Sequence, residues 1–173
     1  DLCLQLETAR LDLFLHTDMR GKDPLTHRYF NALEDFTLTR QLKYLLIDLT
    51  RQRLFGASFD RSLLQVCTQR MEQGRPLPVS GQINYHLLLM LLGEDAASHE
   101  TALDQLLEAH ETHIGDEIIN IYGYYQNYLQ QRYQEGELDA LARLFVIYER
   151  MLNLRIVFDR GAFTTHLIRN MTV

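Results

Sequence analysis

Six glycines at nearly regular intervals are the feature that most constrains how this chain can fold. They stand at positions 56, 74, 93, 115, 136 and 161, so that successive members lie 18 to 25 residues apart. A glycine directly after a helix readily takes the left-handed conformation that ends many helices, because it has no Cβ to clash. A helix of about 15 residues followed by a short turn gives this spacing. The glycines therefore predict a series of helices of similar length.

The apolar residues between these glycines also favour helices. The 173 residues include 32 Leu against 9 Ile and 5 Val, and Leu loses less rotamer freedom in a helix than β-branched residues do. Leu38, Leu42, Leu45, Leu46 and Leu49 form one stripe on a 3.6-residue period,. We expect helices near 2–17, 25–36, 37–55, 60–73, 80–92, 98–113, 116–134, 137–153 and 162–172, with 25–55 as one bent helix as the alternative. The residues expected to cap helix starts are Asp60, Ser80, Ser98 and Asp116.

The predicted helices repeat in pairs of about 40 residues. Helices expected to start near 60, 98 and 137 are 38 and 39 residues apart. Residues 124–169 combine an aromatic helix over 124–133, an acidic turn with glycine at 136–139, an apolar helix over 141–151 and a second aromatic segment at 163–169. This stretch resembles a pentatricopeptide unit, and the chain is similar more generally to degenerate tetratricopeptide-like repeat proteins, including uncharacterised bacterial ones.

This resemblance implies an all-α fold of stacked antiparallel helical hairpins, a tetratricopeptide-like α-solenoid. A compact α-bundle is the alternative. The length of 173 residues is that of one domain,, so we expect a single repeat domain over 1–173. Because the chain starts with Asp1 rather than Met, we expect it to be an excerpt of a longer one.

Composition excludes several classes of protein. The two cysteines, Cys3 and Cys67, are too few for a disulfide framework or a four-thiolate zinc site,. The longest apolar run, residues 87–92, is far too short to cross a bilayer,. The first residues have no basic segment typical of a signal peptide,. We therefore expect a cytoplasmic protein that does not enter the membrane.

Charge is distributed unevenly along the chain. The formal net charge is −6, but residues 94–139 alone contain eleven acidic residues and one basic residue, Arg132. Such a block is either a solvated face that keeps the protein soluble or a docking surface for a basic partner. Nucleic-acid binding needs a basic groove along the phosphates, so the acidic block argues against it. The alternative of a single-stranded RNA-binding repeat protein would require convergence of the arginines at 40, 51, 53, 143 and 150 on one face.

Signatures of catalysis and metal binding are weak. The chain has no phosphate-binding glycine loop and no nucleophile elbow,. His99, His110 and His113 would suit a metal if they met in one cavity, but helical di-metal sites use Glu-x-x-His, and that spacing does not occur around these histidines. We expect no enzyme activity, no metal and no cofactor, with a helical-bundle metal-dependent enzyme as an alternative. Cys67 lies on an apolar stripe and is predicted to be buried.

Five tyrosines gather in the helix expected over 116–134, around Gly123, which is predicted to allow close approach of another helix,. Tyr124 and Tyr128 are predicted to be its exposed members, and Tyr is frequent in interface hot spots. We therefore expect a protein–protein interaction scaffold that binds a protein with a basic surface. Its predicted contact residues are Glu108, Glu111, Asp116, Glu117, Tyr124 and Tyr128. Apolar residues in the expected helix 162–172 also predict possible self-association through that C-terminal helix.

Overall fold

The computed structural model describes residues 24–56, 58–155, 158–159 and 162–163. Its elements are α2 (Pro24–Phe55), α3 (Ser62–Glu72), α4 (Val79–Leu92), α5 (Ala96–His110), the short 3-10 helix η1 (Glu111–His113), α6 (Glu117–Gln134), α7 (Leu138–Asn153), β1 (Phe158–Asp159) and β2 (Ala162–Phe163). The chain is predominantly helical, which confirms the predicted helical class. The chain divides into two units, residues 1–82 and 83–173, and the division between Gln82 and Ile83 falls within α4.

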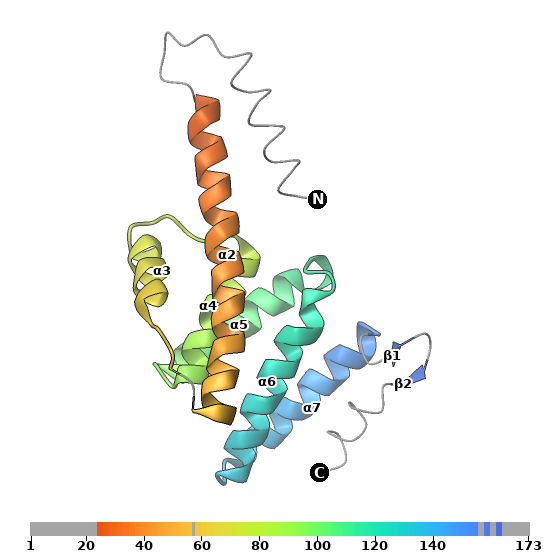
Figure 1. The fold of residues 1–173 in the computed structure, drawn as a ribbon. Helices are drawn as coiled ribbons and strands as arrows, with labels where there is room; N and C mark the ends of the chain where they lie inside the picture. The colour runs from red at the N-terminus through yellow and green to blue at the C-terminus, as the bar shows by residue number, and fades with distance from the viewer. Residues whose placement is uncertain (1–23, 57, 156–157, 160–161, 164–173) are drawn as a thin grey trace. The chain divides into compact units, whose positions relative to one another are not determined.

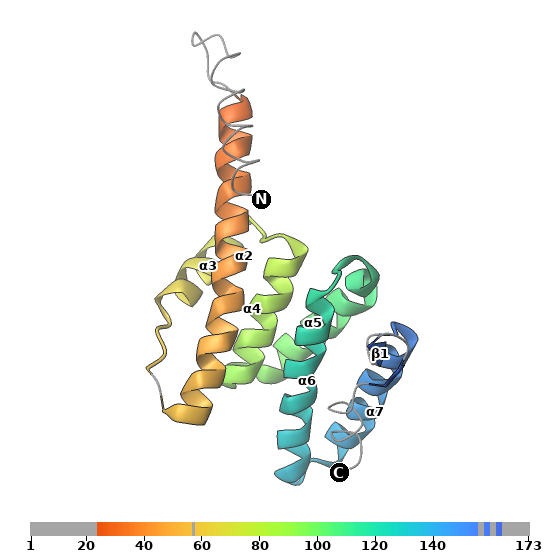
Figure 2. The same ribbon diagram turned by 45° about the vertical axis from the view of Figure 1, so that its right-hand side comes forward.

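Residues 24–55 form one continuous helix, so the alternative of a single helix over this segment is the correct one (Figure 1). Pro24 stands at its first position, where a missing N–H costs nothing,. Neither glycine nor proline follows until Gly56. In the predicted stripe, Leu45 is half-buried and the other four leucines, at 38, 42, 46 and 49, are buried. The first turns of α2 project beyond α3 in both ribbon views (Figures 1 and 2).

The first unit joins α2 to α3. Leu64 and Cys67 of α3 are buried, as predicted for Cys67. The Arg70 guanidinium at the end of α3 is also buried, and it pairs with the carboxylate of Asp35 on α2. Arg75 adds a second link, because its Nη2 donates to Glu34 Oε2 at 3.1 Å. These ion pairs therefore fix the end of α3 and the residues just after it to the N-terminal half of α2.

The second unit begins with the most buried helical segment, the part of α4 from Ile83 onward. The residues of α4 from Ile83 to Leu91 are buried except for half-buried His86, which agrees with their nearly continuous apolar sequence. Next along the chain, α5 leads through η1 to α6. The helices α6 and α7 lie side by side as an antiparallel hairpin in both views (Figures 1 and 2). One such hairpin is consistent with the predicted stack of hairpins. The α-solenoid, the alternative of a compact bundle and the single repeat domain all stay predictions.

The glycine prediction is confirmed in the described residues. Gly56, Gly74, Gly93, Gly115 and Gly136 all have φ between 68° and 101°, the left-handed region. Gly123 differs, because a Cβ there would meet no atom within 4 Å. The predicted close helix approach at Gly123 is therefore wrong. The glycine in close contact is Gly81, where a Cβ would lie 2.8 Å from Thr39 Oγ1.

Three predicted caps and one predicted helix need correction. Ser80 and Ser98 lie inside α4 and α5, because these helices begin one and two residues earlier than expected. Asp60 stands one residue before Arg61, the N-cap of α3, although its Oδ1 accepts from the Ser62 N–H at 2.9 Å. Asp116 is the N-cap of α6, as predicted, but makes no side-chain capping bond. Phe158–Asp159 and Ala162–Phe163 pair as antiparallel strands, so the expected helix 162–172 does not begin at 162. The rest of that prediction and the expected helix 2–17 lie outside the described residues.

Candidate functional site

Four ionised side chains and one tyrosine hydroxyl, from three helices, meet inside the second unit. We call this group the charged cluster: Glu100 and Asp104 of α5, Tyr125 and Arg132 of α6, and Arg143 of α7. Glu100 is the buried centre, with 1% of its surface exposed. It precedes Leu103 and Leu107 by three and seven residues, so the helical period places it on the buried stripe of α5.

The geometry of the charged cluster leaves no Glu100 oxygen unpaired. Arg132 Nη1 donates to Glu100 Oε2 at 2.8 Å, and Arg143 Nη1 lies 2.9 Å from Glu100 Oε1. Arg143 Nη2 donates to Asp104 Oδ2 at 2.7 Å. The Tyr125 hydroxyl donates to Asp104 Oδ1 at 3.0 Å and lies 3.2 Å from Glu100 Oε1. Three helices are thereby linked through one carboxylate.

Electrostatics explain what this cluster does. Burial raises the pKa of the Glu100 carboxyl, and the guanidiniums of Arg143 and Arg132 oppose that rise. Burial also raises the pKa of Tyr125, so its hydroxyl stays protonated and able to donate. A carboxylate that is paired on both oxygens positions helices rather than abstracting a proton from a substrate. The interpretation of the acidic block as a solvated face is therefore wrong for Glu100.

A pair of histidines lies in the same unit. His86 of α4 and His99 of α5 face each other with their Nδ1 atoms 2.9 Å apart, and the Tyr85 ring meets both imidazoles edge-on. One Nδ1 must donate and the other accept, so the contact holds one proton. Burial, with the neighbouring His99, lowers the pKa of His86 to about 4. His86 is thus neutral at physiological pH.

The convergence of His99, His110 and His113 that the metal-dependent alternative requires does not form in the part of the chain that the structure describes. There, no group of three or more His, Cys, Asp or Glu side chains is placed to hold an ion. His99 pairs with His86, whereas the ring of exposed His113 lies 3.1 Å from the Thr112 hydroxyl.

The six predicted contact residues have different environments. Glu108 of α5 and Asp116, at the start of α6, are exposed, whereas Glu117 is half-buried. Glu111 accepts a hydrogen bond from the buried Tyr122 hydroxyl. Tyr124 and Tyr128 are half-buried, and the Arg132 guanidinium lies 5.5 Å from the centre of the Tyr128 ring. Tyr133 is the tyrosine of α6 that is exposed, so the predicted exposure of Tyr124 and Tyr128 is wrong, while their role in binding stays a prediction.

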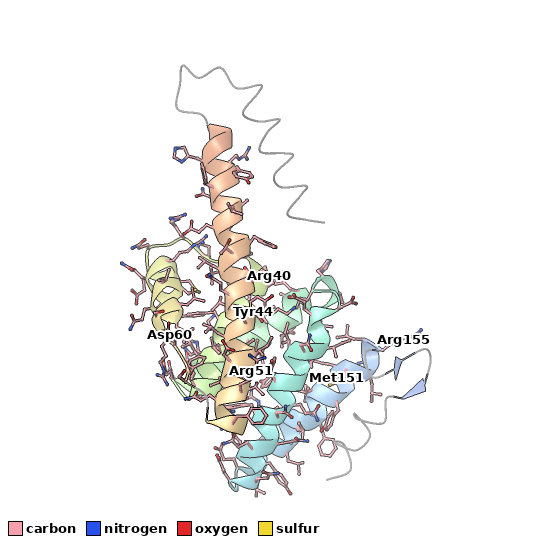
Figure 3. All side chains as sticks on the ribbon, viewed as in Figure 1. Arg40, Tyr44, Arg51, Asp60, Met151 and Arg155 are labelled. Carbon is pink, nitrogen blue, oxygen red and sulfur yellow. The ribbon has the colours of Figure 1, made fainter. Side chains whose placement is uncertain are left out.

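Sequence reasoning did not identify a face of α2 on which arginine and aromatic residues alternate. We call it the arginine–aromatic face, and its members follow one another at intervals of four, four, three, four and four residues: Phe36, Arg40, Tyr44, Ile47, Arg51 and Phe55. At 100° per residue these positions fall on one side of a helix. Figure 3 labels Arg40, Tyr44 and Arg51 in order along α2.

The contacts of this face involve little ion pairing. The Arg40 guanidinium lies 5.7 Å from the centre of the Phe36 ring and 5.9 Å from that of Tyr44. Arg51 has one long ion pair, at 3.7 Å from Asp48. Tyr44 and Ile47 are exposed, and Phe55 is 79% exposed. The pattern of aromatic residues at four-residue spacing, interrupted by arginines, could have revealed this face from the sequence.

None of the described helices combines the length and apolarity that crossing a bilayer requires. In comparisons with known proteins, no family model, curated protein or solved structure matches the chain significantly.

Proposed function

We propose that this chain is a protein-binding scaffold of helical hairpins, without catalysis of its own, and that it binds its partner through the arginine–aromatic face of α2. The single observation that carries the proposal is the exposed succession of Arg40, Tyr44, Arg51 and Phe55 on one side of a helix. Arginine and aromatic residues are enriched in the energetic hot spots of protein interfaces.

The chemistry of the face specifies the kind of partner. Its two guanidiniums are eleven residues apart, or about 16 Å along the helix, and apolar groups lie between them. This spacing fits an amphipathic helix whose apolar side chains contact Tyr44 and Ile47 and whose carboxylates reach Arg40 and Arg51. Two cations, one of them beside Asp48, are few for nucleic acid, which needs many phosphate contacts. An acidic amphipathic protein segment is therefore the proposed ligand.

The engagement of the charged cluster supports the same choice. Arg143 is paired with Glu100 and Asp104, so it is not available to bind phosphates in the RNA-binding alternative. Within the charged cluster the groups with a shifted pKa contact one another, as in structural ion-pair networks,.

The proposal is tested by capturing partners from source cells with the full tagged chain, in the presence of nuclease. We expect a stoichiometric partner that is lost when Arg40→Glu and Arg51→Glu are combined. The matched control is Arg28→Glu, which reverses a charge on another side of the same helix,. A photo-crosslinking phenylalanine analogue in place of Tyr44 should link the partner through an acidic segment.

Two results would overturn this assignment. Capture that nuclease abolishes would indicate nucleic acid instead. A partner that is retained by the α2 variant but lost on combining Glu108→Lys with Asp116→Lys would place binding on the predicted acidic surface.

A further inference from the structure

The helix α7 is apolar on two opposite sides. One side packs within the second unit and contains buried Ala140, Leu144, Ile147, Tyr148 and Met151. The other side contains Leu138, Ala142, Phe145, Glu149 and Leu152, all of them exposed, and we call it the α7 stripe. Leu138 is 76% and Phe145 65% exposed. Large apolar side chains that are exposed together on one side of a helix mark an interaction surface, so the α7 stripe has the properties of an interface.

The spacing along the α7 stripe is symmetric. Leu138, Phe145 and Leu152 are separated by seven residues each, the repeat that keeps apolar side chains along a seam between two helices. Phe145 stands at the centre. When two copies of this helix are laid antiparallel about Phe145, Leu138 of each copy faces Leu152 of the other, and the two Phe145 rings meet at the twofold axis. A twofold interface of this kind uses the same patch on both subunits.

The charge on the stripe is compatible with the antiparallel arrangement and not with the parallel one. Glu149 is the carboxylate of the α7 stripe, and it lies four residues from the centre. In an antiparallel pair it faces the region of Leu141 and Ala142 of the second copy, where the small Ala142 leaves room. The two Glu149 positions are then about 12 Å apart along the axis. In a parallel pair the two carboxylates would face each other, which is unfavourable.

We propose that two copies of this chain associate through antiparallel contact of their α7 stripes. This dimer does not depend on the proposed function, because the arginine–aromatic face belongs to α2. Self-association was expected at residues 162–172, and the proposal moves it to α7. A dimer would present two arginine–aromatic faces and would hold a partner with two acidic segments more tightly than one face can.

The test is the mass of the full chain in solution, measured by sedimentation and light scattering from low micromolar to submillimolar concentration. We expect the mass to rise with concentration from 20.3 kDa to twice that value. Phe145→Glu should keep the protein monomeric over the whole range, because it places two carboxylates at the twofold axis. Phe145 is exposed, so the helical circular dichroism of this variant should equal that of the unchanged protein.

The control is Phe30→Glu, the same change at an exposed aromatic residue of α2, which should leave dimerisation unchanged. Combining Leu138→Lys with Leu152→Glu tests orientation. In the antiparallel pair each introduced cation faces an introduced anion, so dimerisation should persist, and it should weaken markedly as salt increases.

Three results would overturn the proposal: a chain that stays monomeric at every concentration, a dimer that survives Phe145→Glu, or a charge-swapped variant that is monomeric at low salt. A chain that stays monomeric at every concentration would indicate that the α7 stripe binds a different protein. Because partner capture through α2 is measured separately, failure of the dimer is distinguishable from failure of the proposed function.

Discussion

Removing both guanidiniums from Glu100 should destabilise the protein by more than the sum of the two single changes. Arg132→Met and Arg143→Met retain most of the aliphatic length of each side chain. Each single variant leaves Glu100 with one counter-charge, at 2.8 or 2.9 Å. The double variant leaves a carboxylate that is 1% exposed without any cation. The two changes are therefore coupled through Glu100.

The magnitude follows from the geometry. At these distances each ion pair has a gross attraction of about 6 kcal/mol in an effective dielectric of about 20, and desolvation offsets most of it. The guanidinium-bearing side chains are 28% and 37% exposed, so water screens them partly. We expect each single variant to lose about 1–2 kcal/mol of unfolding free energy. The double variant should lose about 3–5 kcal/mol, the usual cost of an uncompensated buried charge.

Urea unfolding followed by circular dichroism provides the assay. The control is Arg51→Met, which removes an exposed arginine with one long ion pair and should change stability by less than about 0.5 kcal/mol. Lower pH adds a second readout. Loss of both guanidiniums raises the pKa of Glu100 further, so its folded form takes up a proton more readily than its unfolded form. The loss of unfolding free energy in the double variant, relative to the unchanged protein, should then become smaller as pH falls. The reasoning would be refuted if the loss in the double variant equalled the sum of the two single losses and did not change with pH.

Two further predictions concern the histidine pair and the glycines. The pKa of His86 is lowered to about 4 from 6.5, so as pH falls the unfolded chain takes up a proton at His86 before the folded protein does. The unfolding free energy, relative to that of His86→Gln, should therefore decline by up to about 3 kcal/mol between about pH 6.5 and about pH 4. Urea unfolding at several pH values measures it, and an unfolding free energy that changes equally with pH in both proteins would contradict the prediction. Gly123→Ala should raise the unfolding free energy by about 0.5–1 kcal/mol, because the position is helical and open,. Gly81→Ala should lower the unfolding free energy by about 1–3 kcal/mol, because the new methyl group would overlap Thr39 Oγ1,. Equal unfolding midpoints for Gly123→Ala and Gly81→Ala would contradict both glycine predictions.

Most of the helices could be predicted from the sequence because their signals are local. The glycines at helix ends and the leucine stripes depend on residues fewer than about twenty positions apart. The join near Phe36 could not be decided from pattern alone. The region holds Thr37, whose side chain can compete with the helical backbone, and in the structure its hydroxyl bonds the Leu33 carbonyl within the same helix.

The charged cluster could be predicted only in part. The helical period places Glu100 beside Leu103 on a buried stripe, which indicates that this carboxylate needs a partner. Its partners Arg132 and Arg143 are 32 and 43 residues further along the chain. Which arginine reaches Glu100 depends on how three helices pack, and no periodicity within one helix contains that information.

The buried position of Glu100 has a consequence for how this sequence can change over generations. Replacing Glu100 alone removes the carboxylate that both guanidiniums share, and replacing both arginines leaves Glu100 without a cation, whereas replacing all three by apolar residues of similar volume is often neutral or stabilising in buried ion networks. Apolar residues at all three positions are thus separated from the present sequence by less stable intermediates. Descendants of this chain should therefore either keep all three ionised residues or lose them together, and a variant with only one or two of them replaced should be rare.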